Sequence, residues 1–462
     1  MLKFVTDQNG IRYELSERLG QGGQGSVYAV KGGRLAVKLI LGGDQLRRDR
    51  LRNQITHVRR LPLRDLALAK PLEMLRPPHT GYVMEMLTGM GPIKSLMNPP
   101  KGESSLAKWY LESGGLRRRL RLLGKAAHLL AQLHGKGLVY SDPSPENIFI
   151  SLTKDDNEVW LIDTDNLQYE ANPANCVFTP GFGAPELIKR TSGATSLSDA
   201  FAFAVLAFQT LTLAHPFIGD MVDAGEPELE EQAYAGLLPW IDDPNDNRNC
   251  SSFGVPRTTV LSQRLVDSFW QAFGPGRANP CARPSLSEWA ERLFAAADGT
   301  IVCPGCSGTY FFNQSVCPWC NLDRPEFATI VFHLWDPGFG AEGGIAMKPK
   351  GESKQPVLMG YGAVTNNQAF IITRRLAFGS LVGQIDLPVV SVTLVDDCVK
   401  LKSLDGNRYL LLTQTGGHKS ELSDREKSIK LEKGRSAWQL HFRASKELHR
   451  VAMFELRGGA RT

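Results

Sequence analysis

The sequence predicts an α+β protein in which strands come first, helices follow, and a short cysteine-rich segment leads into an all-β region. Residues 11–40 carry three strand-like runs with glycine-rich turns, whereas apolar residues recur at helical spacing from Leu116 to Leu133. Two C-x-x-C pairs lie within residues 303–320, and from about Phe327 onward the alternation is typical of strands.

A length of 462 residues exceeds one ordinary domain, and 42% hydrophobic with 22% charged residues allows a sizeable core. The formal charge of +5 is mild for this size, so no nucleic-acid partner is expected. The N-terminus lacks the apolar centre of a signal peptide. The most apolar run, Ala200 to Phe208, is far shorter than the roughly 18 to 20 residues that span a bilayer. We therefore expect no membrane partner and a cytoplasmic location.

A glycine-rich turn and the strand after it indicate a nucleotide site. The pattern G-x-G-x-x-G-x-V occurs with its defined positions at Gly20, Gly22, Gly25 and Val27. Glycines let backbone amides approach a phosphate closely, although any glycine-rich hairpin can show this pattern. The next strand contains Ala36 and Lys38 in a sequence like V-A-I-K, whose lysine pairs with the α- and β-phosphates.

The stretch from Val139 to Leu167 places two carboxylates and a carboxamide at one end of a predicted hairpin. Asp142 is followed five residues later by Asn147, and the second strand leads into Asp163. Phosphoryl-transfer enzymes arrange a nucleophile-orienting acid and two metal ligands in this way.

In this order, the motifs resemble those of protein kinases. The catalytic loop H-R-D-L-x-x-x-N is represented by residues 140–147, D-F-G by residues 163–165, and A-P-E by residues 184–186. The resemblance implies a bilobal protein-kinase-like fold over residues 1–298, with the N-lobe about 1–87 and the C-lobe about 88–298.

The resemblance also implies roles for individual residues. Asp142 orients the substrate hydroxyl and accepts its proton, and Lys38 positions the phosphates of ATP. Asn147 and Asp163 hold Mg²⁺ (or Mn²⁺). The hinge backbone from Glu85 to Leu87 meets the adenine edge.

The C-lobe landmarks of the family follow. Asp199 begins an almost wholly apolar helix, which we expect to be buried on all sides. By resemblance, Asp199 holds the backbone of the catalytic loop, and Arg283 pairs with Glu186.

Other positions depart from the family pattern. No glutamate lies between Lys38 and Glu73 to hold the strand lysine, so Gln54 has the best spacing for that task and Asp49 the next best. Asp165 replaces the glycine of D-F-G and is expected either to bind a second metal ion or to be a turn residue.

The catalytic loop differs as well. Tyr140 stands for the structural histidine, Ser141 for the arginine that reads an activation-loop phosphate, and Ser144 for a lysine on the γ-phosphate. Because one cation is missing, we expect a slow enzyme or one completed by a partner.

The predicted function is ATP-dependent transfer of the γ-phosphate to Ser or Thr hydroxyls of a partner protein. The metal motif is similar to that of a divergent bacterial branch of Ser/Thr-kinase-like proteins in tellurite-resistance-associated (TerY-phosphorylation) systems. This implies a bacterial signalling or stress-response role, with a von Willebrand A-type protein and a metal-dependent phosphatase as partners. The alternatives are a nucleotide-binding pseudokinase scaffold and, third, a small-molecule kinase.

Four arginines interrupt the helical pattern after Leu116, at Arg117, Arg118, Arg119 and Arg121. We interpret them as a solvated face, with a docking patch as the alternative.

Downstream, Cys303, Cys306, Cys317 and Cys320 form two knuckles with the spacing of a structural zinc ribbon over residues 299–325. A segment so short needs metal ligation to fold. Unligated cysteines and a rubredoxin-like iron site are the alternatives.

Residues 326–462 are predicted to form a β-sandwich or barrel that recruits a protein partner. The expected strands are Thr329 to Leu334, Ala369 to Thr373, Val389 to Val395, Tyr409 to Thr413, Trp438 to Phe442 and Val451 to Leu456. His418, His441 and His449 are expected to be isolated surface or packed residues. The charged stretch Ser420 to Gly434 is expected to be a mobile loop.

Overall fold

The computed structural model describes residues 3–22, 25–40, 42, 44–100, 102–103, 105–170, 177–339, 343–350, 353–379, 383–413 and 418–459. The chain divides into two compact units. The first comprises Met1–Trp109, Arg121–Pro256 and Gln263–Ala290, and the second comprises Tyr110–Leu120, Arg257–Ser262 and Glu291–Thr462. No helix within the described ranges is both long and apolar enough to cross a membrane.

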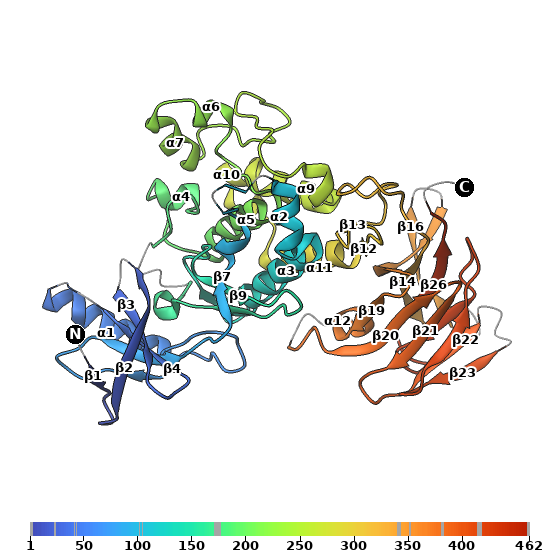
Figure 1. Cartoon of the computed structure of the whole chain (residues 1–462), viewed down its shortest axis with the longest axis horizontal. Helices are drawn as coiled ribbons and strands as arrows, with labels where there is room; N and C mark the ends of the chain where they lie inside the picture. Colours follow the sequence, from blue (N-terminus) through green and yellow to red (C-terminus); the bar gives the residue numbers. More distant parts are fainter. Residues whose placement is uncertain are drawn as a thin grey trace. The chain divides into compact units, whose positions relative to one another are not determined.

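The first unit begins with an antiparallel sheet of strand order β1-β2-β3-β4-β6-β5 (Figure 1). Its strands are β1 (Phe4–Thr6), β2 (Arg12–Gly22), β3 (Gly25–Val30), β4 (Leu35–Leu39), β5 (Glu73–Met74) and β6 (Gly81–Glu85). The three strands expected within residues 11–40 are confirmed as β2, β3 and β4. Gly25 lets β3 approach β4 closely, since a Cβ there would lie 2.1 Å from the carbonyl oxygen of Leu39.

Helix α1 (Gln45–Arg60) packs on this sheet. The carboxylate of Asp44 caps its first turn by accepting from the backbone N–H of Arg47 at 2.7 Å. Ile55 of the helix is fully buried and forms a core cluster with Ile40, Met74 and Tyr82. The cluster fixes α1 beside β4, the strand that carries Lys38.

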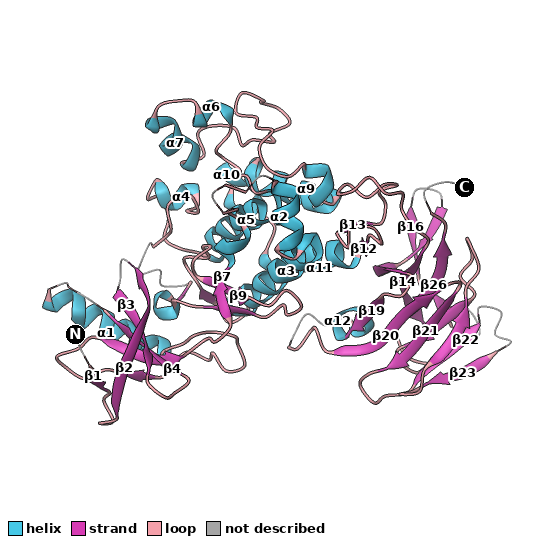
Figure 2. Ribbon diagram, in the orientation of Figure 1, coloured by secondary structure: helices cyan, strands magenta, loops and turns pink. Residues whose placement is uncertain are grey.

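Helices dominate residues 93–298, most of which belong to the first unit (Figure 2). Helices and short helical turns between residues 93 and 298 are η1 (Ile93–Leu96), α2 (Leu106–Glu112), α3 (Gly115–His134), η2 (Thr164–Asn166), α4 (Pro185–Ile188), α5 (Ser196–Thr212), α6 (Asp220–Asp223), α7 (Pro227–Tyr234), α8 (Arg257–Val260), α9 (Gln263–Phe273), α10 (Pro275–Ala278), η3 (Pro280–Ala282) and α11 (Leu286–Asp298). Helix α5 is buried almost throughout, as expected from its apolar sequence. Its Phe208 packs edge-on against Phe269 and Phe273 of α9.

Small sheets connect these helices to the catalytic loop. Strands β7 (Met90–Pro92), β9 (Ile148–Ser151) and β10 (Val159–Leu161) pair in the order β10-β9-β7, and β8 (Leu138–Val139) pairs with β11 (Gln168–Tyr169). The antiparallel β9–β10 pair is the hairpin expected between Asn147 and Asp163, and Ile148 lies opposite Leu161.

In the second unit, β12 (Thr300–Val302) and β13 (Thr309–Phe311) form a hairpin next to the cysteine pairs. A β-rich region follows. Its elements are β14 (Phe327–Asp336), β15 (Gly344–Ile345), β16 (Met347–Lys350), β17 (Ser353–Pro356), β18 (Leu358–Thr365), β19 (Ala369–Thr373), α12 (Arg374–Phe378), β20 (Pro388–Val395), β21 (Cys398–Ser403), β22 (Tyr409–Thr413), β23 (Lys419–Leu422), β24 (Lys427–Lys430), β25 (Trp438–His441) and β26 (His449–Arg457).

One sheet has the order β15-β14-β26-β25-β22-β23, with β18 also paired to β14, and another has the order β19-β20-β21-β24. Buried side chains of both sheets, such as Phe332 and Val392, share one core. The expectation of a β-rich C-terminal region is confirmed, and each of the expected strands is present within a residue or two. The finer prediction of a sandwich or barrel, like the boundaries at residues 298 and 325, stays a prediction.

Two expectations for this region are wrong. The stretch Ser420 to Gly434 contains most of β23 and all of β24, because Leu422 and Ile429 turn inward between charged neighbours and join the core. His441 and His449 are packed residues, which was one of the two alternatives, but they are not isolated, since His441 Nδ1 and His449 Nε2 lie 2.9 Å apart in the interior.

The interpretation of the arginines at the start of α3 as a solvated face is also wrong. Arg119 is fully buried, with its guanidinium 3.8 Å from the centroid of the Tyr110 ring. It donates to the carbonyl of Tyr110 at 3.1 Å and to the hydroxyl of Ser113 at 2.7 Å, while Arg117 donates to the hydroxyl of Thr300 at 2.7 Å. Burial lowers the pKa of Arg119 to about 10.

We expect Arg119→Ala to destabilise the second unit by about 2–4 kcal/mol, because buried acceptors lose their donor and a cavity forms. Arg121→Ala, a change at a partly exposed position of the same helix, is the matched control and should cost much less. Urea unfolding measures both variants. Equal losses would contradict a specific role for the buried guanidinium.

Candidate active site

The catalytic loop, residues 140–147, is held by a buried carboxylate. Asp199, which is 0% exposed, accepts from the backbone N–H of Tyr140 at 2.8 Å and of Ser141 at 2.9 Å. His134 Nε2 also lies 3.0 Å from this carboxylate. The contact expected for Asp199 by resemblance is therefore present, and it fixes the backbone just before Asp142.

Tyr140 occupies the position of the family histidine and makes its own connection. Its hydroxyl donates to the carbonyl of Ile162 and lies 3.2 Å from the carbonyl oxygen of Asn147. Burial, together with the surrounding carboxylates, raises the pKa of Tyr140 well above its usual value, so the hydroxyl keeps its proton. The phenol thus ties the catalytic loop to the residue that precedes Asp163.

Asp142 is surrounded by donors. Its carboxylate accepts from the backbone N–H and the hydroxyl of Thr179, both at 2.9 Å, and from the side-chain amide of Asn147 at 3.0 Å. Burial raises the pKa of Asp142, and the bonds from Thr179 and Asn147 oppose that rise. The donors favour the ionised form, which is the form a proton acceptor needs. No motif of the sequence indicates a role for Thr179, although it opens the segment that ends in A-P-E.

Lys38 lies in β4 and is 6% exposed. Its Nζ contacts Oδ1 of Asp163 and lies 3.1 and 3.0 Å from Oδ1 and Oδ2 of Asp165. Burial lowers the pKa of Lys38, but the charges of Asp165 and Asp163 outweigh it, so the pKa is raised and the ammonium is kept. The structure therefore brings Lys38 and Asp163 into direct contact.

The expected partners of Lys38 on helix α1 are not its partners here. The side-chain amide of Gln54 donates to the carbonyl of Leu167 at 3.0 Å, and Asp49 accepts from Gln45 at 3.0 Å. Asp165, expected to be a metal ligand or a turn residue, lies in the short turn η2, and its side chain is 2% exposed and bound to Lys38. The sequence shows a carboxylate in place of the D-F-G glycine. The direction in which the Asp165 side chain points depends on the preceding backbone, where Asp163 is left-handed with φ 56°.

Asn147 and Asp163 lie at adjoining ends of β9 and β10, where the N–H of Ile162 donates to the carbonyl of Asn147 at 3.0 Å. The Asp163 side chain is 27% exposed, in contrast to the buried Asp165. A carboxylate oxygen and an amide oxygen are ligands that Mg²⁺ prefers. The geometry of this pair suits a magnesium ion.

The nucleotide-turn residues lie on the same sheet as Lys38. Gly22 pairs with Gly25 across the β2–β3 turn, whose residues 23 and 24 lie outside the described part of the chain. Ala36 is two residues before Lys38, and Val27 is the cross-strand partner of Lys38. All three side chains therefore share one face of the sheet, while Gly20 stands earlier in β2.

At the expected hinge, Glu85 ends β6, and the N–H of Met86 donates to the carbonyl of Arg34 at 2.9 Å. Leu87 follows as a partly exposed residue. The contact of Glu85 and Leu87 with adenine stays a prediction.

The A-P-E glutamate has the partner expected by resemblance. Arg283 donates through both terminal nitrogens to Glu186, at 2.7 and 2.8 Å, and its side chain is fully buried. Such bidentate pairs are geometrically specific, so the pair fixes the end of the segment that begins at Thr179.

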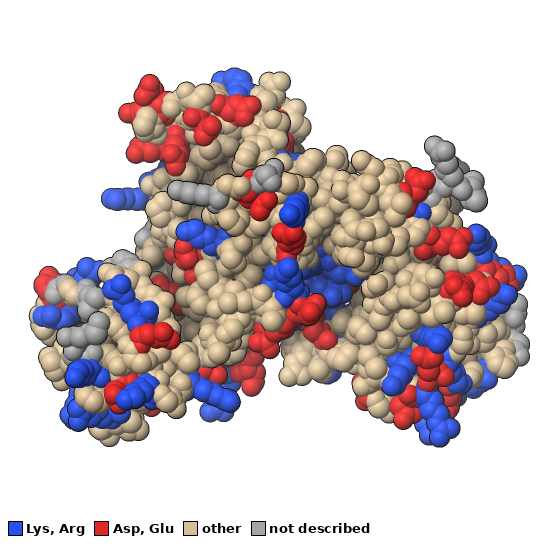
Figure 3. All heavy atoms as spheres, in the orientation of Figure 1, with Lys and Arg blue, Asp and Glu red and all other residues tan. Residues whose placement is uncertain are grey.

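A groove of about 820 Å³ runs from Thr179 and Glu146 past Phe182 to Asp220 and Asp223. Acidic side chains gather over the neighbouring helices α6 and α7 (Figure 3). The chain carries no lysine or arginine between residues 191 and 247. Negative charge therefore predominates along the groove, where the lining residue Lys94 is paired with Glu146 at 2.6 Å.

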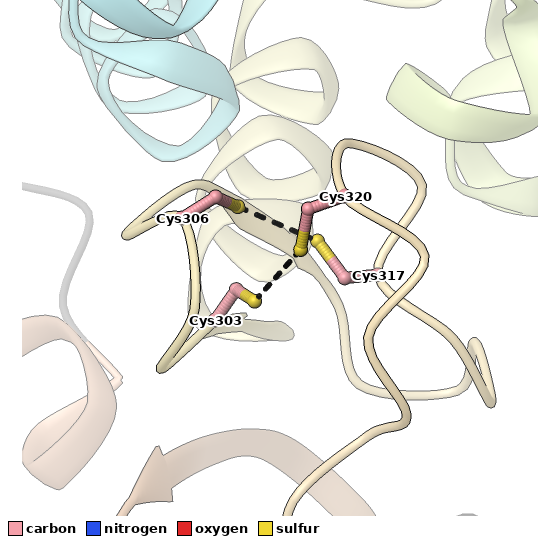
Figure 4. Close-up of side chains that lie close together, drawn as sticks. All are labelled: Cys303, Cys306, Cys317 and Cys320. Carbon is pink, nitrogen blue, oxygen red and sulfur yellow. Dashed lines mark hydrogen bonds between the residues drawn. The ribbon is translucent and has the colours of Figure 1, made fainter.

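A second candidate site lies in the other unit (Figure 4). The sulfur atoms of Cys303, Cys306, Cys317 and Cys320 all lie within 4.8 Å of one another. The Sγ–Sγ distances are 3.5 Å for Cys303–Cys320 and 3.7 Å for Cys306–Cys317. Trp319 stacks on Tyr110 with ring centroids 5.4 Å apart and so packs the cysteine segment against helix α2.

Comparison with known proteins agrees with this geometry. The sequence model of the protein kinase domain matches residues 13–253, more than half of the chain. Human calcium/calmodulin-dependent protein kinase type 1B is 25% identical over 264 residues, which cover 54% of this chain and 70% of that protein. Serine/threonine-protein kinase PknD of Chlamydia trachomatis serovar D is 26% identical over 243 residues, 45% of this chain but only 25% of that protein.

Fold and site thus define a phosphoryl-transfer enzyme of the protein kinase class. The chain belongs to the protein kinase family. The prediction of an enzyme of Ser/Thr protein kinase type is confirmed by these matches, and family membership implies use of ATP and Mg²⁺ on a protein substrate.

We expect the acid limb of the pH–rate profile to lie above the usual titration range of an aspartate, because burial raises the pKa of Asp142. Thr179→Ala removes a donor that favours the carboxylate, so it should move this limb to still higher pH. Thr179→Ser keeps the hydroxyl and should leave the limb in place. Initial rates across pH measure the effect, and an unmoved limb in Thr179→Ala would contradict this role.

Proposed function

We propose that the chain transfers the γ-phosphate of ATP to a Ser or Thr hydroxyl of a partner protein, with Asp142 as the proton acceptor. The observation that supports this most is the Asp142 carboxylate, which is held by Asn147 and by Thr179, a residue that lines the groove. In this position it can orient a substrate hydroxyl and take its proton as the oxygen becomes a nucleophile.

Within this proposal, Lys38 binds the α- and β-phosphates, and Asn147 and Asp163 hold Mg²⁺, which neutralises charge on the phosphates when bound. The amide oxygen of Asn147 accepts no hydrogen bond from the described residues, so it is available to a cation. Gly20, Gly22, Gly25, Val27 and Ala36 form the phosphate and adenine side of the site, and the backbone of Glu85 and Leu87 meets the adenine edge.

The rate should be modest. Ser144 is 1% exposed and its N–H donates to the carbonyl of Asp142, so its short neutral side chain supplies no charge to the γ-phosphate. A missing cation at a transferring phosphoryl group costs several powers of ten in rate in related chemistry. A partner that supplies a cation would restore part of that rate.

Asp142→Asn should lower phosphate transfer by about 10²- to 10⁴-fold while ATP binding persists, because only the proton acceptor is lost. Asp155→Asn, an exposed change in the turn between β9 and β10, is the control and should keep full activity. Transfer of labelled phosphate and ATP affinity are measured side by side. ATP binding with equal, background transfer in both wild type and Asp142→Asn would favour the pseudokinase scaffold.

The comparison with small-molecule kinases rests on the same assay. The Arg283–Glu186 pair and the open acidic groove favour a polypeptide substrate. Transfer to a small hydroxyl compound but to no protein would favour the third alternative.

For the second unit, we propose a structural zinc ribbon at Cys303, Cys306, Cys317 and Cys320. The sulfur cluster suits a tetrahedral ion with no open position, and thiols kept for a metal fit a reducing, cytoplasmic compartment. The β-rich region would then recruit a protein. By family resemblance, a von Willebrand A-type protein and a metal-dependent phosphatase in a bacterial tellurite-resistance-associated system are the proposed partners.

Purified protein should contain about one zinc ion per chain. Cys306→Ser should lower the zinc content and destabilise the second unit, since ligation stabilises the fold of a segment this short. Cys250→Ser, at an exposed cysteine of the first unit, should change neither. Elemental analysis with thermal unfolding checks this, and full stability of metal-free Cys306→Ser would overturn the structural role.

A further inference from the structure

Helix α1 offers no carboxylate to Lys38 among the described residues. Its one acidic residue, Asp49, accepts from Gln45 at 3.0 Å. The side-chain amide of Gln54 donates to the carbonyl of Leu167 at 3.0 Å. The lysine must therefore be held from elsewhere.

Asp165 holds it from the strand-to-turn segment. Both of its oxygens lie within 3.1 Å of Lys38 Nζ, and its side chain is 2% exposed. The turn η2 that carries it is fixed by Thr164, whose hydroxyl donates to the carbonyl of Ala69 at 3.1 Å, and by the N–H of Leu167, which donates to the carbonyl of Thr164 at 3.2 Å. A buried carboxylate in a fixed turn can face a lysine without any contribution from a helix.

Asp163 and Asp165 differ in what they can do next. Asp163 is 27% exposed and can turn to a metal ion, whereas the buried Asp165 has no comparable access to solvent. When Asp163 binds a cation, Lys38 loses one partner and keeps the other. A buried ammonium without any partner would be strongly disfavoured, so the remaining carboxylate keeps the lysine charged and in place.

We propose that Asp165 is the positioning residue for Lys38 and that it replaces a helix carboxylate in this role. This inference rests on the proposed function only for the statement that Lys38 binds ATP phosphates. The pairing itself is a property of the folded chain.

The first experiment measures ATP affinity in the presence of Mg²⁺. Asp165→Asn should weaken binding by roughly 10- to 100-fold, the scale of one charge-assisted hydrogen bond. In a Lys38→Met background the same change should cause little further loss, because Asp165 acts through the lysine. Asp165→Glu should recover part of the affinity. Gln54→Ala, a change on α1, should leave affinity as in wild type.

The opposite ranking, with Gln54→Ala weaker than Asp165→Asn, would overturn the inference and assign the lysine to the helix. An affinity loss caused by Asp165→Asn that is equally large in the Lys38→Met background would also overturn it, because an effect exerted through Lys38 disappears when the lysine is absent. If wild type fails to bind ATP, the proposed function fails, and the pairing is then decided by stability.

That second experiment is a double-mutant cycle on urea unfolding, which needs no ATP. Asp165→Asn should destabilise the wild-type chain but be neutral or stabilising in a Lys38→Met background, where Asp165 is a buried charge without its cation. Equal destabilisation in both backgrounds would show that the two side chains do not depend on each other. The cycle remains informative if Asp165→Asn folds poorly by itself.

Discussion

A buried ammonium shared by two carboxylates lies at the centre of this kinase. Lys38 comes from the N-terminal sheet, whereas Asp163 and Asp165 follow the hairpin of the catalytic loop. Desolvating these charges is costly and is offset only when each has a partner at close range. The arrangement therefore requires that β4 and the segment after Asp163 lie at a fixed distance from each other. The close approach of β3 and β4 at Gly25, the buried Tyr82 and the η2 turn are consistent with that requirement.

The catalytic loop keeps its geometry although several family side chains are absent. Tyr140 replaces the histidine and still connects the loop to the strand before Asp163. Thr179 supplies two donors to Asp142, and Asp199 supplies the acceptors for the loop backbone. The catalytic loop and Asp142 are thus held in place by different donors from those of the family pattern. No residue of the loop replaces the cation that is absent at Ser144.

Sequence patterns gave good guidance where local spacing determines structure. The G-x-G-x-x-G-x-V and V-A-I-K-like strands, the Asp142–Asp163 hairpin, the buried helix α5 and the alternating strands of the second unit are all present. Patterns failed where a distant partner decides. Arg119 is buried because Tyr110 and Ser113 fold back on it, and Asp165 faces Lys38 because of the backbone after Asp163. Neither the burial of Arg119 nor the direction of the Asp165 side chain can be predicted from residue spacing along one helix or one turn.

The phenol at position 140 has a further consequence. A histidine imidazole at this position would take up a second proton below about pH 6.5, and its unprotonated ring nitrogen would then no longer accept a hydrogen bond. The hydroxyl of Tyr140, whose pKa is raised well above its usual value by burial and nearby carboxylates, does not titrate in that range. The hydrogen bond from Tyr140 to the carbonyl of Ile162 therefore persists at acidic pH, whereas a histidine at this position would change its hydrogen bonding.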